Sequence, residues 1–232
     1  MFREEIDESL VFVGMPFETK FQSRWDNVIN PGIMDAGFTP YRVDARIIND
    51  SIIMDILKGI NTAKVLLFDI SKGKGGFRNG NVMYELGLAH AQRAPDAIIV
   101  LRDDDDRLLF DIAPYRVKEF SSIVESDMRN EISSLISEVV RTIDMTKEKI
   151  VEETIRLLDI SSLQMVGSFI KDSMVMSNIG TVHWGSIPPE DYRPTVRRLL
   201  ELGLIKYIEE DEHGSVYSLT NLGKVVRNLI KT

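Results

Sequence analysis

Residues 64–91, KVLLFDISKGKGGFRNGNVMYELGLAHA, contain the alternation that determines the fold. The first seven residues are a strongly apolar run with one acid, Asp69, near its end, and this predicts a buried strand. A glycine-rich loop over 71–80 follows. The stretch from Asn79 onward begins with cap-forming residues and is apolar on most sides, which predicts a helix buried against a sheet. That helix carries one carboxylate, Glu85, close to its amino end.

The same alternation extends to both sides of this stretch. Strands are predicted at 10–15, 38–43 and 97–101, with a weaker one at 115–120, and helices at 21–36, bent at Pro31, and at 50–63. Short Val/Ile/Leu strands that alternate with helices indicate a doubly wound parallel sheet covered on both faces. Such sheets bind ligands beyond the carboxyl ends of their strands, at the switch in strand order.

The pattern changes after residue 143. Residues 128–143 and 147–158 predict one long helix, or two with a pause near Asp144, and we interpret 144–159 as a helical linker. Helices at 161–173, 194–202 and 221–230, with a hairpin formed by 204–209 and 215–219, predict a small winged-helix-like α+β domain over 160–232. The first domain is expected to span 1–143.

Composition restricts the classes of function. The chain has 232 residues, no cysteine, three histidines without the spacing of a metal pair, and a net charge of −8. We therefore expect no disulfide, thiolate chemistry, metal site or cofactor. Without a membrane-length apolar run or a signal peptide, we expect a cytoplasmic protein that does not bind membranes. The acidic balance is not typical of nucleic-acid binding.

Topology places three loops at the carboxyl ends of the strands. The expected ligand-binding residues in these loops are Gly14, Met15, Pro16, Phe17, Asp44, Ser71, Asn79 and Asn81. The loop over 71–80 presents either cations and backbone N–H groups to a phosphate or a flexible surface segment. Arg42 and Asp44 either hold a ligand or form an internal ion pair. The acidic run 103–106 is expected to be a solvated loop.

Glu85 itself allows two interpretations. A structural one is that its carboxylate meets the positive amino end of its helix, with Asn79 or Asn81 as a simple cap. A functional one is that Glu85 and Asp69 face the ligand crevice together. A carboxylate there can attack or stabilise an electron-poor sugar carbon.

The segments VFVGMPF, GFTPYRVD, FDIS and NVMYELGLAHA resemble the nucleoside 2-deoxyribosyltransferase-like superfamily and the related TIR-like domains, over about residues 10–120. This resemblance implies a flavodoxin-like fold, with Glu85 as the nucleophile that attacks the sugar and Asp69 as an assisting acid. Two positions depart from the family's pattern. Phe12 stands where a tyrosine is expected, and Asn79 stands where an acid is expected.

The C-terminal part offers a second, weaker candidate site. Arg193, Arg197 and Arg198 lie on or near the helix that reads DNA in a winged-helix protein. The acidic run 209–212 at the hairpin would repel phosphates, so an interaction or dimerisation module is favoured over DNA binding.

We therefore expect an enzyme that cleaves the N-glycosidic bond of a nucleoside, nucleotide or NAD, as hydrolase or transferase, and that forms a homo-oligomer. The alternative is a non-catalytic nucleotide sensor or a transcriptional regulator that acts through the winged-helix domain.

Overall fold

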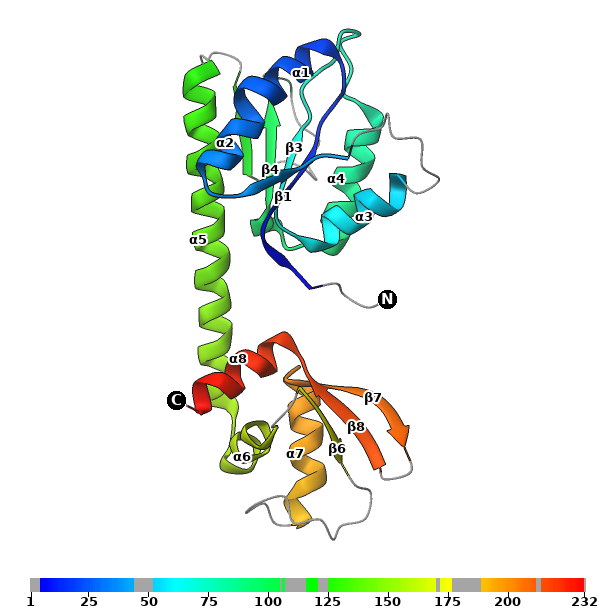
Figure 1. Cartoon of the computed structure of the whole chain (residues 1–232), viewed down its shortest axis with the longest axis vertical. Helices are drawn as coiled ribbons and strands as arrows, with labels where there is room; N and C mark the ends of the chain where they lie inside the picture. The colour runs from blue at the N-terminus through cyan, green and yellow to red at the C-terminus, as the bar shows by residue number, and fades with distance from the viewer. Residues whose placement is uncertain are drawn as a thin grey trace. The chain divides into compact units, whose positions relative to one another are not determined.

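The computed structural model describes residues 5–43, 52–104, 106, 116–120, 125–169, 172–176, 189–211 and 214–231 (Figure 1). Contacts within the chain divide it into two compact units, Met1–Asp144 and Met145–Thr232. The predicted domain limits, including the linker over 144–159, stay predictions. In the described part, no helix has the length and apolar character that a membrane crossing requires.

The first unit is built on a five-stranded parallel sheet. Its strands are β1 (Asp7–Gly14), β2 (Thr39–Tyr41), β3 (Ala63–Asp69), β4 (Ile98–Arg102) and β5 (Arg116–Glu119). They lie in the order β2-β1-β3-β4-β5, and every neighbouring pair is parallel. This is the strand order of the flavodoxin-like doubly wound fold, with the switch point between β1 and β3. The predicted fold class of this unit is confirmed.

Helices cover both faces of the sheet. One face is covered by α1 (Thr19–Arg24), α2 (Asn30–Asp35) and the first part of α5 (Glu125–Leu157), and the other by α3 (Ile52–Thr62) and α4 (Gly80–Gln92) (Figure 1). A short 3-10 helix, Pro95–Ala97, precedes β4. A π-helical turn, Trp25–Ile29, joins α1 to α2 just before Pro31. Since proline has no N–H to donate, this irregularity lies at the predicted bend.

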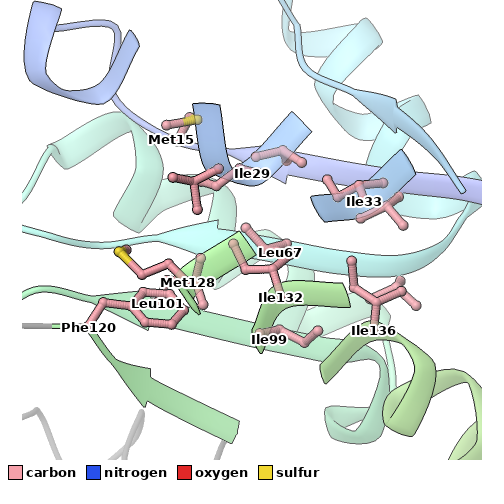
Figure 2. Close-up of a cluster of buried hydrophobic side chains, with 14 of the residues drawn as sticks. Met15, Ile29, Ile33, Leu67, Ile99, Leu101, Phe120, Met128, Ile132 and Ile136 are labelled. Atoms are coloured by element: carbon pink, nitrogen blue, oxygen red, sulfur yellow. The ribbon is translucent and has the colours of Figure 1, made fainter. Parts of the chain in front are cut away.

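The hydrophobic core forms two layers, one on each side of the sheet. On one side, Leu67, Ile99 and Leu101 from the strands pack against Ile29 and Ile132 (Figure 2). Ile29 ends the π-helical turn between α1 and α2, and Ile132 belongs to α5. Each of these side chains is fully buried and contributes about 1.5–3 kcal/mol. Because β3 and β4 are buried on both faces, they are continuous apolar runs in the sequence.

Helix α5 is unbroken over Glu125–Leu157 and contributes residues to both units. The sequence left open a long helix or two helices with a pause near Asp144. The segment contains no glycine or proline to end the helix. Asp144 instead binds the nearly buried Lys64 of β3, with a separation of 2.9 Å between Oδ1 and Nζ.

The second unit combines helices with an antiparallel sheet. Its elements are α6 (Ile160–Ser168), β6 (Ser173–Met176), α7 (Pro189–Glu201), β7 (Ile205–Asp211), β8 (Gly214–Leu219) and α8 (Asn221–Ile230), and the strand order is β6-β8-β7. Strand β6 was not predicted. Helix α7 begins at Pro189 and includes Pro194, the residue at which the sequence predicts the helix to start. The winged-helix identity of this unit stays a prediction.

Candidate functional site

A pocket of about 410 Å³ lies at the carboxyl ends of β1 and β2, on the face covered by α3 and α4. Four segments line it: the end of β1 with its loop, the residues after β2, one side of α3, and the first turns of α4. The lining residues are Phe12, Val13, Met15, Pro16, Phe17, Arg42, Val43, Ile52, Ile53, Ile56, Asn79, Asn81, Val82, Tyr84 and Glu85. The pocket is therefore mostly apolar, with few polar groups. It adjoins the switch point between β1 and β3, where this fold binds ligands.

Glu85 is the acid in this pocket. It lies on the second turn of α4, half-buried, and its carboxyl has no hydrogen bond or ion pair within the described part of the chain. Burial raises the pKa of this carboxyl from 4.5 to about 7, because an apolar environment disfavours the charged form. The amino end of a helix favours the ionised form by only about 0.3–1 kcal/mol at exposed sites. Burial therefore outweighs the stabilisation that the structural interpretation offered.

Gly14, at the end of β1, leaves the space that the Glu85 side chain occupies. A Cβ atom on Gly14 would lie 2.8 Å from Glu85 Oε2 and 2.5 Å from the ring of Phe68. Such distances are too short for carbon, so a larger residue at this position would displace one of the two side chains. Gly14, predicted as a ligand-binding residue, is not among the residues that line the pocket, and its lack of a side chain makes room for Glu85 instead.

Asn79 caps α4 and also lines the pocket. Its Oδ1 accepts hydrogen bonds from the backbone N–H groups of Asn81 at 3.0 Å and Val82 at 3.3 Å. The cap fixes the first turn of the helix. Asn81 also lines the pocket, so the helix start supplies two neutral amide side chains beside Glu85.

The loop after β1 is held in place by Arg42. The Arg42 guanidinium carbon lies 4.1 Å from the centre of the Phe17 ring and 5.3 Å from that of Trp25. Its Nη2 donates to the carbonyl oxygen of Pro16 at 3.1 Å. Arg42 is the second charged side chain of the pocket lining. Asp44, the other candidate in this segment, lies outside the described residues.

Asp69 and Ser71 do not line this pocket. Side chains alternate along a strand, so Asp69 shares the face of Leu67, on which α1 and α5 lie. There Asp69, fully buried, accepts hydrogen bonds from Arg24 Nη1 at 2.6 Å and from the backbone N–H of Ser71 at 3.0 Å. Arg24 also donates to Ser71 Oγ and to Asp103 at 2.9 Å. The structure therefore separates Asp69 from Glu85 by the thickness of the sheet.

The glycine-rich loop and the acidic run 103–106 neutralise each other. Arg78 binds Asp104 through two hydrogen bonds of 3.1 and 2.8 Å, and Lys72 pairs with Asp106. Asp103 pairs with Lys20 at 2.8 Å as well as with Arg24. Asp103, Asp104 and Asp106 of the acidic run are therefore ion-paired rather than freely solvated. Two cations of the glycine-rich loop are bound to carboxylates, which weakens its interpretation as a phosphate site.

Sequence reasoning missed most of the apolar wall. Ile52, Ile53 and Ile56 lie on one side of α3, and Tyr84 lies beside Glu85 on α4. The helical spacing i, i+3, i+4 from Asn81 places Tyr84 and Glu85 on the same side of α4 as that residue. This spacing was the signal available in the sequence.

The arginines of the second unit have acidic neighbours. Arg197 pairs with Glu201 at 2.9 Å on the exposed face of α7, and Arg198 pairs with Asp159 at 3.0 Å. Arg193 is exposed. These pairs give no support to a DNA-binding surface. Among the described residues, no group of three or more His, Asp or Glu side chains converges as metal ligands would.

No protein-family model and no curated protein match the sequence. Several solved structures have a similar fold. A flavo di-iron protein from Thermotoga maritima is 16% identical, with 59% of this chain and 37% of that chain covered and a TM-score of 0.42. A diflavin flavoprotein A3 from Nostoc sp. is 12% identical, with 60% of this chain and 95% of that chain covered and a TM-score of 0.41. Rubredoxin oxygen:oxidoreductase from Desulfovibrio gigas is 11% identical, with 61% of this chain and 36% of that chain covered and a TM-score of 0.38.

These comparisons correct the resemblance inferred from the sequence. The structures named above are a flavo di-iron protein, a diflavin flavoprotein and an oxidoreductase, and none of the three is a nucleoside 2-deoxyribosyltransferase or a TIR-like domain. The expected glycosidase, hydrolase or transferase activity, the nucleotide-sensor alternative, and the nucleoside, nucleotide or NAD ligand are withdrawn with it. An oxidoreductase among these names agrees with the expectation of an enzyme in general. The chain spans little more than a third of two of these proteins, and the likeness concerns the fold alone.

Proposed function

We propose that the first unit binds a small organic molecule in the pocket and that Glu85 exchanges a proton with it as a general acid–base group. The observation that carries this proposal is the Glu85 carboxyl, which lies at the wall of an apolar pocket without a partner in the described residues. Buried carboxyls normally have a partner, because an unsatisfied polar group costs free energy. A bound ligand would supply one.

The environment of Glu85 suits proton transfer near neutral pH. With a pKa of about 7, the carboxyl is present there in both its protonated and its ionised form. The protonated form donates a proton, and the ionised form accepts one, with little solvent to compete. Asn79 and Asn81 add neutral hydrogen-bonding groups that orient a ligand without changing its charge.

The flavin named in the similar structures does not fit the residues at the start of α1. A flavin mononucleotide carries a phosphate, which binds best at a helix amino terminus with free N–H groups. Here the residue before α1 is Glu18, and its carboxylate accepts the backbone N–H of Lys74 at 2.8 Å. Pro16 removes one further N–H from the same loop. A negative side chain at this position repels a phosphate, so we derive no flavin chemistry for this site.

Proton transfer can be tested with a general substrate. The ring of 5-nitrobenzisoxazole opens when a base removes its C–H proton, the N–O bond breaks, and a coloured cyanophenolate leaves. We expect the full chain to accelerate this reaction, with a rate that rises with pH through about 7 as Glu85 ionises. Glu85→Gln should abolish the acceleration, since an amide accepts no proton.

Two variants separate the pocket from the rest of the surface. Ile56→Trp fills the pocket, and we expect it to remove the acceleration as well. Met34→Trp adds the same side chain at an exposed position on α2, and we expect it to leave the rate unchanged. Retention of the full rate in both Glu85→Gln and Ile56→Trp would contradict the proposed function.

A further inference from the structure

Two loops meet at the carboxyl edge of the sheet next to the pocket. One connects β3 to α4 over residues 70–79, and the other follows β4 and is described at Asp103, Asp104 and Asp106. Three side chains near α1 hold the first half of the β3–α4 loop. Arg24 donates to Ser71 Oγ, Lys20 donates to the carbonyl oxygen of Lys72 at 2.9 Å, and Glu18 accepts the N–H of Lys74.

The second half of this loop depends on Arg78. Its Nη1 donates to the carbonyl oxygen of Ile70 at 2.6 Å, and both terminal nitrogens bind the Asp104 carboxylate. The side chains of Arg78 and Asp104 are only 19% and 13% exposed. Among the described residues, Arg78 supplies the side-chain hydrogen bonds that connect 75–78 to the rest of the unit. A bidentate, mostly buried pair of this kind fixes orientation as well as distance.

Arg78 directly precedes Asn79, the cap of α4. Arg78 is therefore the last residue that is tied to the rest of the unit before the cap of the helix. The first two turns of α4 carry Asn81 and Glu85, which line the pocket. We propose that Arg78, through its pair with Asp104, is a positioning residue that fixes the start of α4 and so keeps the Glu85 carboxyl in its buried position. The inference rests on the proposed function for its significance, and its test does not require a ligand.

The test compares three variants by the carboxyl titration of Glu85, followed by ¹³C NMR in the full chain. Arg78→Met and Asp104→Asn each remove the pair from one side. The matched control is Arg129→Met, which removes a second two-bonded arginine–aspartate pair, with Asp35, between α5 and α2 on the other face of the sheet. If Arg78 positions the helix start, water reaches Glu85 in the first two variants.

We expect the Glu85 midpoint to fall by about one pH unit toward its ordinary value in Arg78→Met and Asp104→Asn. The midpoint should stay unchanged in Arg129→Met. In Arg78→Lys it should take an intermediate value, since lysine binds the Asp104 carboxylate at one point where arginine makes two bonds to it. Ring opening of 5-nitrobenzisoxazole by Arg78→Met should shift its pH profile in the same direction as the titration.

The outcomes separate this inference from the proposed function. A Glu85 midpoint unchanged in folded Asp104→Asn and Arg78→Met overturns the positioning role, whatever the wild-type chain does to the substrate. A midpoint that shifts as expected, in a chain that does not open the ring, supports the positioning role and contradicts the proposed function. If Arg78→Met does not fold, the Glu85 midpoint in Asp104→Asn tests the positioning role instead. That variant keeps the hydrogen bond from Arg78 to the carbonyl oxygen of Ile70.

Discussion

Asp69 and Glu85 are two carboxyls near the same edge of one sheet, and they lie on opposite faces of it. Asp69 is fully buried and bound by Arg24 and by a backbone N–H. Glu85 is half-buried, and the described residues give its carboxyl no partner. The difference shows that the chemical role of an acid follows from its partners rather than from its place in the topology. Asp69 is held by partners within the fold, whereas we propose that Glu85 serves a ligand.

The largest effect is expected when the paired acid loses its cation. Arg24→Met leaves Asp69 buried without its counterion, which should lower the free energy of unfolding by about 3–5 kcal/mol. Urea unfolding of the full chain, followed by the amide NMR signals of β1 and β3, measures this. Glu85→Gln, at pH 8, should not destabilise the same unit. A loss below 1 kcal/mol in Arg24→Met would remove the contrast between the two acids.

A second prediction concerns the pH dependence of stability. The pKa of Glu85 is about 7 in the folded state and near 4.5 in an unfolded chain, so the unfolded chain releases this proton first as the pH rises. The contribution of Glu85 to stability is therefore complete below about pH 4.5 and is lost as the pH rises through 7, by up to about 3 kcal/mol. Urea unfolding at several pH values should show that Glu85→Gln gains stability relative to the wild type over this interval. Parallel pH profiles for both proteins would contradict the raised pKa.

A third prediction tests the space that Gly14 leaves for Glu85. Gly14→Ala should destabilise the first unit by about 1–3 kcal/mol, because the new Cβ overlaps Phe68 and the Glu85 carboxyl. Gly87→Ala on α4 is the control, since nothing lies within 4 Å of its added Cβ. Alanine favours a helix interior over glycine, so the control should be more stable by about 0.5–1 kcal/mol. Thermal unfolding of both variants shows whether each substitution raises or lowers stability. Equal changes in stability for the two variants would argue against the close packing at Gly14.

The smallest effect is expected for an exposed pair. Arg197 and Glu201 lie four residues apart on α7, with side chains that are 82% and 63% exposed. Solvent screens such pairs, so Arg197→Ala should change the free energy of unfolding by less than about 0.5 kcal/mol. Thermal unfolding of the second unit checks this. A loss comparable to that of Arg24→Met would mean that burial does not explain the difference between the pairs.

The sequence predicted the sheet of the first unit because its strands are continuous apolar runs. The same property hid the face on which Asp69 lies. Leu66, Leu67 and Phe68 are all apolar, so no alternation of polar and apolar residues shows which way the next side chain points. The order of strands and helices predicted Asp69 beside Glu85. In the structure the Asp69 side chain points to the opposite face of β3, because side chains alternate along a strand.

The candidate site was predicted in part. Glu85, Asn79 and the loop after β1 were identified because they follow strand ends or begin a helix. The ion pairs of the acidic run were missed because they join residues far apart in the chain, such as Arg78 and Asp104. Local pattern carries no information about such contacts. Strand β6 was missed because four residues are too few for a clear period.

The carboxyl titration of Glu85 by ¹³C NMR in the full chain tests the central claim most directly. We predict a midpoint near 7, because the pocket wall removes water from the carboxyl and no described residue binds it in place of that water. The midpoint should also move when a molecule occupies the pocket. A titration near 4.5 would show that Glu85 is solvated like an ordinary surface acid and would contradict its proposed role in proton transfer.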